Sequence, residues 1–180
     1  SDFPDNYRIL GQGSVFGIPY LFIITIILYI IGYILLKRTA YGQHVYAVGS
    51  NRAAAILSGI NADAVKIKAF IISGLLASLA GVLLASRVMA VQADTGIGIE
   101  FEVIAGVIIG GTSLKGGEGN VFYTILGVLI IGMIRNGLNM TQIDISWNQF
   151  VTGGVIVGAV LLDSLRKVIQ KRIQEKYYEG

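Results

Sequence analysis

Long apolar runs alternate with short polar stretches along most of the chain. A helix that crosses the hydrocarbon core of a membrane needs about 20 consecutive, mostly apolar residues. Runs without a charged residue that approach this length occupy residues 18–36, 69–86, 119–134 and 145–162. A weaker run at 101–114 has only 12 uncharged residues in a row, and it predicts a short crossing, a re-entrant half-helix or a buried segment. The pattern therefore predicts an all-α membrane protein with about five transmembrane helices.

A polar stretch at residues 41–66, YGQHVYAVGSNRAAAILSGINADAVK, separates the first two apolar runs. Ser50 and Asn51 are both residue types that cap the start of a helix. The sequence RAAAIL that follows is rich in strong helix formers. Gly59 is suited to the position after a helix end, where a left-handed backbone is common. The stretch therefore predicts a short helix of about two turns.

The predicted short helix carries a small apolar face, made of Ala53, Ala54 and Leu57. Because the surrounding stretch is too polar to be buried in lipid, this face suits insertion into a groove on a soluble partner. Asn61 can cap the helix that follows, and Asp63 lies in its first turn, where the helix dipole favours an acidic residue.

The basic residues indicate how the apolar runs are oriented. Cytoplasmic segments of membrane proteins carry an excess of Lys and Arg. If all five runs cross and the N-terminus is outside, eleven of the 14 basic residues lie on the cytoplasmic side. A re-entrant run at 101–114 would place the basic end of the chain outside, so we favour a crossing. This topology makes residues 1–17 an extracytoplasmic loop, residues 18–162 the transmembrane region and residues 163–180 a cytoplasmic tail.

Composition agrees with a membrane protein whose helices pack closely. Hydrophobic residues make up 54% of the chain and charged residues only 14%, compared with about 25% charged residues in soluble domains. Small residues four positions apart let membrane helices approach each other. Pairs of this kind are Gly74 and Ser78, Ala77 and Gly81, Gly106 and Gly110, and Gly154 and Gly158. They predict a tightly packed bundle.

The chain offers little reactive chemistry. It has one histidine, His44, and no cysteine, which excludes imidazole clusters, disulfides and thiolate metal sites. Glu100 and Glu102 are two positions apart and do not share a helix face, which argues against a catalytic pair. The sequence GGTSLKGGEGN at 110–120 lacks the lysine of a phosphate-binding loop at the required position, and its glycines predict a tight turn.

Polar, uncharged side chains and a tryptophan collect at the predicted outer ends of the last two helices. They are Asn136, Asn139, Trp147, Asn148 and Gln149. These residues could line a path for a polar, uncharged solute, or they could form a belt at the membrane interface. The sequence leaves both interpretations open.

Four stretches, in this order, give the chain a resemblance to a known family. They are LGQGSVFGIP, TAYGQHVYAVGSNRAAAILSGI, GVIIGGTSLKGGEGNV and IRNGLNM. The chain resembles the ribose-type branch of the ABC transporter permeases, which are the membrane subunits of ATP-driven sugar importers. Members of that branch are about twice as long, so the resemblance implies that this chain is a C-terminal half.

The resemblance implies a mechanism and a set of partners. Two permease subunits would form a pathway through the bacterial inner membrane, with the C-terminus in the cytoplasm. Two cytoplasmic ATPases would drive transport, and an extracytoplasmic binding protein would deliver a monosaccharide. ATP and Mg would belong to the ATPase, with no cofactor in this chain and no nucleic acid among its partners.

The resemblance also assigns a coupling helix, the segment through which such a permease contacts its ATPase. It would include Ser50, Asn51, Arg52, Ala53, Ala54, Leu57 and Gly59. Some importers have the signature Glu-Ala-Ala at this point, where this chain has Arg-Ala-Ala, so a role for that glutamate does not transfer.

Alternatives of two classes stay open. A permease for branched-chain amino acids is closely related, although the uncharged Asn and Gln cluster favours a sugar over a zwitterion. An ion channel or a membrane scaffold is the second alternative, but neither needs a coupling helix. The lack of a reactive constellation disfavours a membrane enzyme.

Overall fold

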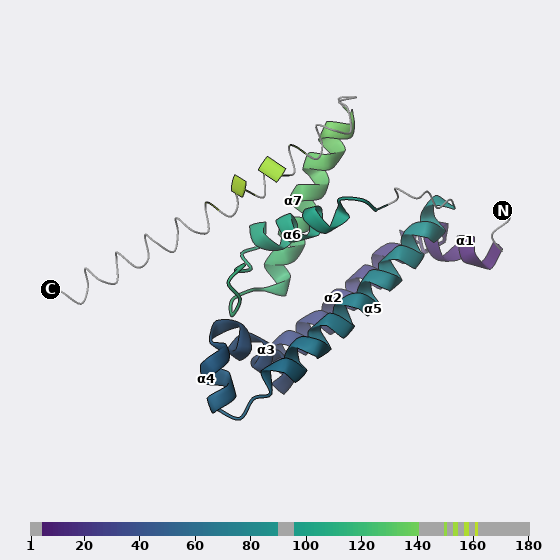
Figure 1. The fold of residues 1–180 in the computed structure, drawn as a ribbon. Coiled ribbons are helices and arrows are strands. Elements are labelled where there is room, and N and C mark those ends of the chain that lie inside the picture. The colour runs from purple at the N-terminus through teal and green to yellow at the C-terminus, as the bar shows by residue number, and fades with distance from the viewer. Residues whose placement is uncertain are drawn as a thin grey trace. The chain divides into compact units, whose positions relative to one another are not determined.

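A computed structural model describes residues 5–89 and 96–140, together with residues 150, 153–154, 157–158 and 161. Apart from one short hairpin, the elements in this part of the chain are helices (Figure 1). The chain divides into two compact units, Ser1–Thr95 and Gly96–Gly180. The helical content agrees with the predicted all-α class.

The first unit contains two long helices bridged by shorter ones. Its elements are α1 (Asp5–Gln12), β1 (Ser14–Val15), β2 (Ile18–Pro19), α2 (Tyr20–Arg38), α3 (Ala40–Ser50), α4 (Arg52–Leu57) and α5 (Ala62–Val88). Helix α1 contacts both α2 and α5, and α3 contacts α2, α4 and α5. Within the described residues, α2 and α5 are the helices long and apolar enough to cross a membrane, with 19 and 27 residues. They correspond to the first two predicted spans.

The predicted loop at 1–17 contains helix α1 and a tight hairpin. Gly11 of α1 lies against the backbone of Ser86 and Arg87 in α5, with no room for a Cβ atom. Phe16 and Gly17 both have positive φ, as a two-residue turn between antiparallel strands requires. The sequence analysis treated residues 1–17 as a loop and missed α1, an amphipathic helix that contacts α5.

The second unit pairs two antiparallel helices, α6 (Ile99–Ile109) and α7 (Val121–Met140). Their backbones meet at glycines. A Cβ atom on Gly106 would lie 2.9 Å from the side chain of Val128, and one on Gly110 would lie 2.6 Å from the Cα of Thr124. A Cβ atom on Gly127 would lie 2.0 Å from the Gly106 carbonyl oxygen. The close packing predicted for Gly106 and Gly110 is confirmed.

The small residues of α5 behave differently. Within the described residues, nothing lies within 4 Å of a Cβ atom built on Gly74 or Gly81. The close contacts predicted for these positions are therefore not made in the part of the chain that the structure describes.

Helix α6 is shorter than the run that predicted it. It has 11 residues, which is about 16 Å, or roughly half of a hydrocarbon core about 30 Å thick. A full crossing by α6 is therefore not confirmed. Helix α7 has 20 residues, of which Val121–Gly137 form the apolar part. The predicted run at 145–162 falls largely outside the described residues, and the tail at 163–180 falls wholly outside them.

The glycine-rich segment between α6 and α7 forms the predicted tight turn. Gly111, Gly116 and Gly117 all have positive φ, which glycine adopts without strain. The Ser113 N–H donates to the Glu118 carbonyl oxygen at 3.1 Å and closes the turn.

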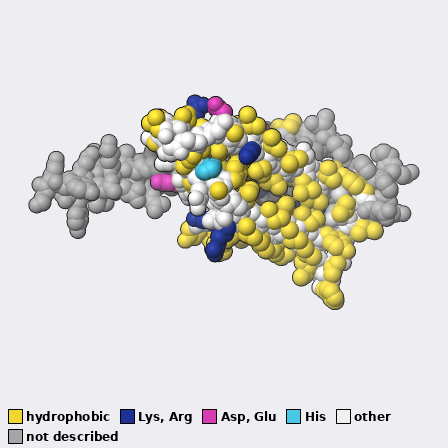
Figure 2. Space-filling view, turned by 90° about the horizontal axis from the view of Figure 1, so that it is seen from below, with side chains coloured by type: hydrophobic (Ala, Val, Ile, Leu, Met, Phe, Trp, Pro, Cys, Tyr) yellow, Lys and Arg dark blue, Asp and Glu magenta, His cyan; other side chains and the backbone are white. Residues whose placement is uncertain are grey.

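Large hydrophobic side chains are exposed on most helices. Phe70 and Leu75 on α5, and Phe122 and Met133 on α7, are all more than half exposed. Figure 2, seen from the side on which α3 and α4 lie, shows hydrophobic side chains over much of the described surface and charged side chains at separate points. A surface this apolar fits helices that contact lipid or further protein.

Candidate functional site

Helix α4 begins and ends with strong capping interactions. The Asn51 side-chain oxygen accepts a hydrogen bond from the Ala54 N–H at 3.0 Å. At the other end, the Gly59 N–H donates to the Ile56 carbonyl oxygen at 2.9 Å, and the Ile60 N–H donates to the Ala55 carbonyl oxygen at 3.0 Å. This pair of bonds, with Gly59 at φ +82°, is a Schellman motif. The predicted end at Gly59 is confirmed, and Asn51 is the start cap.

Ser50, the other candidate cap, is the last residue of helix α3. The sequence analysis did not predict α3, because its polar residues give no clear apolar stripe. Thr39 could have indicated the start of α3, because threonine is a common N-cap residue. Its side-chain oxygen caps α3 by accepting a hydrogen bond from the Gly42 N–H at 3.2 Å. The Tyr41 hydroxyl donates to the Val65 carbonyl oxygen at 3.5 Å, and burial raises the pKa of Tyr41.

The two faces of α4 differ in exposure. Ala55 faces inward and is buried. Ala53 and Ala54 are exposed, and Leu57 is 90% exposed. Ile56, which the sequence analysis did not include, is half exposed. The exposed apolar surface of α4 is therefore formed by Ala53, Ala54, Ile56 and Leu57, and it is not covered by any described part of the chain.

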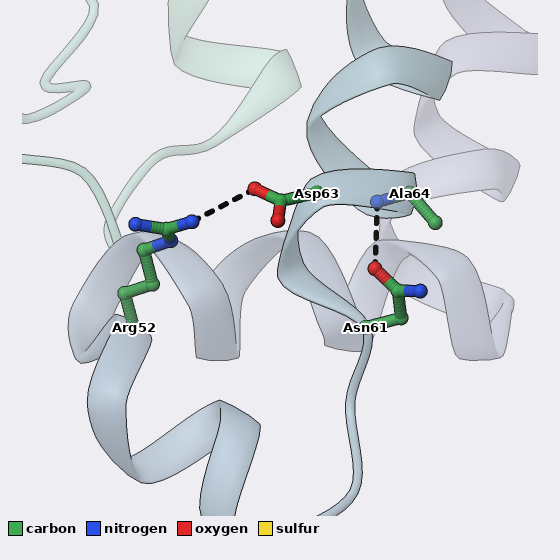
Figure 3. Close-up of polar contacts among 4 residues, drawn as sticks. All are labelled: Arg52, Asn61, Asp63 and Ala64. Carbon is green, nitrogen blue, oxygen red and sulfur yellow. Dashed lines mark hydrogen bonds and ion pairs between the residues drawn. The ribbon is translucent and has the colours of Figure 1, made fainter.

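An ion pair joins α4 to the start of α5 (Figure 3). The Arg52 guanidinium donates to the Asp63 carboxylate at 2.8 Å. Beside it, the Asn61 side-chain oxygen caps α5 by accepting from the Ala64 N–H at 2.9 Å. Both charged side chains are largely exposed, so the ion pair contributes little to stability. It holds the Arg52 side chain toward Asp63 at the start of α5.

A shallow hollow lies beside this ion pair. It has a volume of about 280 Å³, and its lining residues are Val45, Val48, Gly49, Arg52, Ala62, Val65, Lys66 and Ala69. These residues come from α3, α4 and the start of α5, so the three helices form one continuous surface. Among the described residues, no group of His, Asp and Glu could hold a metal ion.

Most of the predicted pathway residues lie outside the part of the chain that the structure describes. Asn136 is exposed on α7, and Asn139 lies in the same helix with its side chain outside the described part. Trp147, Asn148 and Gln149 also lie outside the described residues. The grouping of these five residues stays a prediction.

An ion pair between α6 and α7 was missed by the sequence analysis. Arg135 donates to the Glu102 carboxylate at 2.7 Å. Glu100, two residues before Glu102, is exposed and does not take part in this pair. The pairing depends on the antiparallel register of the two helices, which the linear sequence does not reveal.

Comparisons with known proteins place the chain among membrane permeases. Residues 1–160 match the model of a family described as branched-chain amino acid transport system / permease component. No solved structure gives a significant match.

Three relatives illustrate the similarity. The ribose import permease protein of Haemophilus influenzae is 41% identical over 91% of this chain and 51% of its own length. The xylose transport system permease protein of the same organism is 40% identical over 84% of this chain and 40% of its own length. The D-allose transport system permease protein of Escherichia coli K12 is 43% identical over 84% of this chain and 47% of its own length. The chain thus spans about half the length of these relatives.

Proposed function

Because the chain belongs to the family of branched-chain amino acid transport system permease components, we propose that it forms part of the transmembrane pathway of an ATP-driven importer. We further propose that the cargo is a monosaccharide. Three relatives that match over most of this chain are named for ribose, xylose and allose, which supports a sugar over an amino acid.

The observation that carries the proposal is the exposed apolar surface of α4. An apolar side chain left in water costs free energy that burial against a partner recovers, about 1.5–3 kcal/mol for a leucine. Leu57 is 90% exposed on a short helix capped at both ends. We propose that this surface docks into a groove on a cytoplasmic ATPase, with Leu57 as its central anchor.

The remaining partners follow from the same proposal. A second permease subunit completes the pathway, an extracytoplasmic binding protein delivers the sugar, and the bilayer surrounds the spans. ATP and Mg are bound by the ATPase and not by this chain. The protein lies in the bacterial inner membrane with α4 and the C-terminus on the cytoplasmic side, as the distribution of Lys and Arg favours.

The test is reconstitution of the complete permease with its ATPase and binding protein in lipid vesicles. Labelled D-ribose, D-xylose and D-allose serve as sugar probes, and labelled L-leucine serves as the control cargo. We expect ATP-dependent uptake of at least one sugar and no uptake of leucine. Uptake of leucine alone would assign the chain to amino-acid transport, and sugar uptake that needs no ATPase would contradict the importer mechanism.

A further inference from the structure

The Glu102–Arg135 ion pair lies between two helices that are otherwise strongly apolar. Helix α6 has the sequence IEFEVIAGVII, and α7 has Arg135 as its single charged residue. The two charges are 2.7 Å apart. Glu102 lies in the first turn of α6, and Arg135 directly follows the uncharged run 119–134, so the pair lies at the ends of the predicted apolar runs and next to Asn136 in the sequence.

The ion pair is not needed to bring α6 and α7 together. Their contact is made by Gly106, Gly110 and Gly127, where the backbones already approach too closely to admit a Cβ atom. Replacing both charges together with uncharged residues would therefore leave the glycine contact between the helices in place, whereas removing one alone would leave the other charge unpaired. The presence of both charges indicates a role beyond helix packing.

Arg135 also has unused hydrogen-bonding capacity. A guanidinium group carries five N–H donors, and within the described residues the single hydrogen bond of this side chain runs from Nη1 to Glu102. The Arg135 side chain is 51% exposed and the Glu102 side chain is 25% exposed. The remaining donors of Arg135 and the second carboxylate oxygen of Glu102 are thus available to a ligand.

We propose that Glu102 and Arg135 line the sugar pathway and bind hydroxyl groups of the passing monosaccharide. A sugar hydroxyl both donates and accepts hydrogen bonds, so it can donate to Glu102 and accept from Arg135. The pair is neutral as a whole, which suits an uncharged cargo. This inference rests on the proposed sugar import. It adds Glu102, a residue of α6, and Arg135 to the residues predicted to line the pathway.

The decisive variant exchanges the two charges, Glu102→Arg together with Arg135→Glu, in the complete permease with its ATPase and binding protein. It keeps an ion pair between α6 and α7 but reverses the positions of donors and acceptors. We expect normal amounts in the membrane, normal association with the ATPase, and a loss of D-ribose, D-xylose or D-allose uptake of about tenfold, whichever sugar the wild type takes up. Uptake within about twofold of wild type would show a purely structural pair and overturn the proposal.

A second variant covers the case in which the exchanged pair does not accumulate in the membrane. Glu102→Gln with Arg135→Gln leaves two uncharged amides that can still bond to each other, and we expect the same loss of uptake at normal abundance. Near-normal uptake would overturn the proposal here too. Glu100→Gln is the matched control, because Glu100 lies on the same helix and is not in the pair, and its uptake should stay within about twofold. If the wild type imports no sugar, the proposed function is wrong. If the wild type and the variants import sugar equally well, the proposed function stands and only the role of the Glu102–Arg135 pair is wrong.

Discussion

At the scale of single residues, the proposed docking of α4 depends most on Leu57. Its side chain is almost fully exposed, while its neighbour Ala55 is buried against the protein. A change at Leu57 therefore alters what α4 presents to a partner and leaves the packing of α4 on the chain untouched.

We expect Leu57→Asp to abolish sugar uptake and sugar-stimulated ATP hydrolysis. The variant loses about 1.5–3 kcal/mol of apolar burial and places an unpaired charge in the groove of the partner. Uptake and ATP hydrolysis by the reconstituted complex measure the effect, and membrane insertion should stay normal. Leu57→Met is the control, since it keeps an apolar side chain of similar size. Normal transport by Leu57→Asp would show that Leu57 is not the anchor. Normal transport by Ala54→Asp as well would contradict the coupling role of α4.

Asn136 allows a test of the predicted polar pathway. We expect Asn136→Leu to lower sugar uptake a few-fold, because one lost hydrogen bond is worth about 0.5–1.5 kcal/mol net. Assembly with the ATPase should be unchanged. Met133→Leu on the same helix conserves side-chain volume and should leave uptake as it is. If Asn136→Leu and Asn139→Leu both transport normally, these residues belong to an interfacial belt.

At the scale of elements, the sequence predicted best those features that depend on a few adjacent residues. The ends of α4 were predictable because the Asn51 side chain and the Gly59 N–H each bond to a residue three positions away. Helix α3 was missed because tertiary contacts with α2, α4 and α5, not an apolar period, hold it in place. The Glu102–Arg135 pair was missed because it joins residues 33 positions apart.

The contact between α6 and α7 gives a prediction at this scale. We expect Gly127→Val to separate the two helices and destabilise their packing by about 1–3 kcal/mol or more. The reason is that a Cβ atom at Gly127 would lie 2.0 Å from the Gly106 carbonyl oxygen. The thermal stability of the detergent-solubilised permease measures the effect. Gly132→Val is the matched control, because no described atom lies within 4 Å of a Cβ atom at that position of α7, and equal stability of the two variants would contradict the packing argument.

At the scale of the whole molecule, orientation in the membrane rests on charge alone. The 180 residues contain no cysteine, so single cysteines introduced at Asp94, Ser113 and Ser164 can be labelled without background from this part of the protein. With an impermeant thiol reagent on intact cells, we expect labelling at Asp94 and none at Ser113 or Ser164. The reason is the excess of Lys and Arg on the predicted cytoplasmic side. Labelling at Ser164 but not at Asp94 would invert the topology.

If α4 docks on a partner as proposed, we expect helix α5 to act as a lever. It is a rod of 27 residues, about 40 Å long, fixed near its C-terminal end by α1, where Gly11 meets Ser86, and joined at its other end to α4 through Arg52 and Asp63. A sideways push on α4 that leaves the α1 contact intact must turn the rod about that contact. The displacement is largest beside α4, half as large midway and zero at the pivot. If α4 docks on an ATPase as proposed, a push on α4 would therefore move the adjacent end of α5 most and its α1 end least.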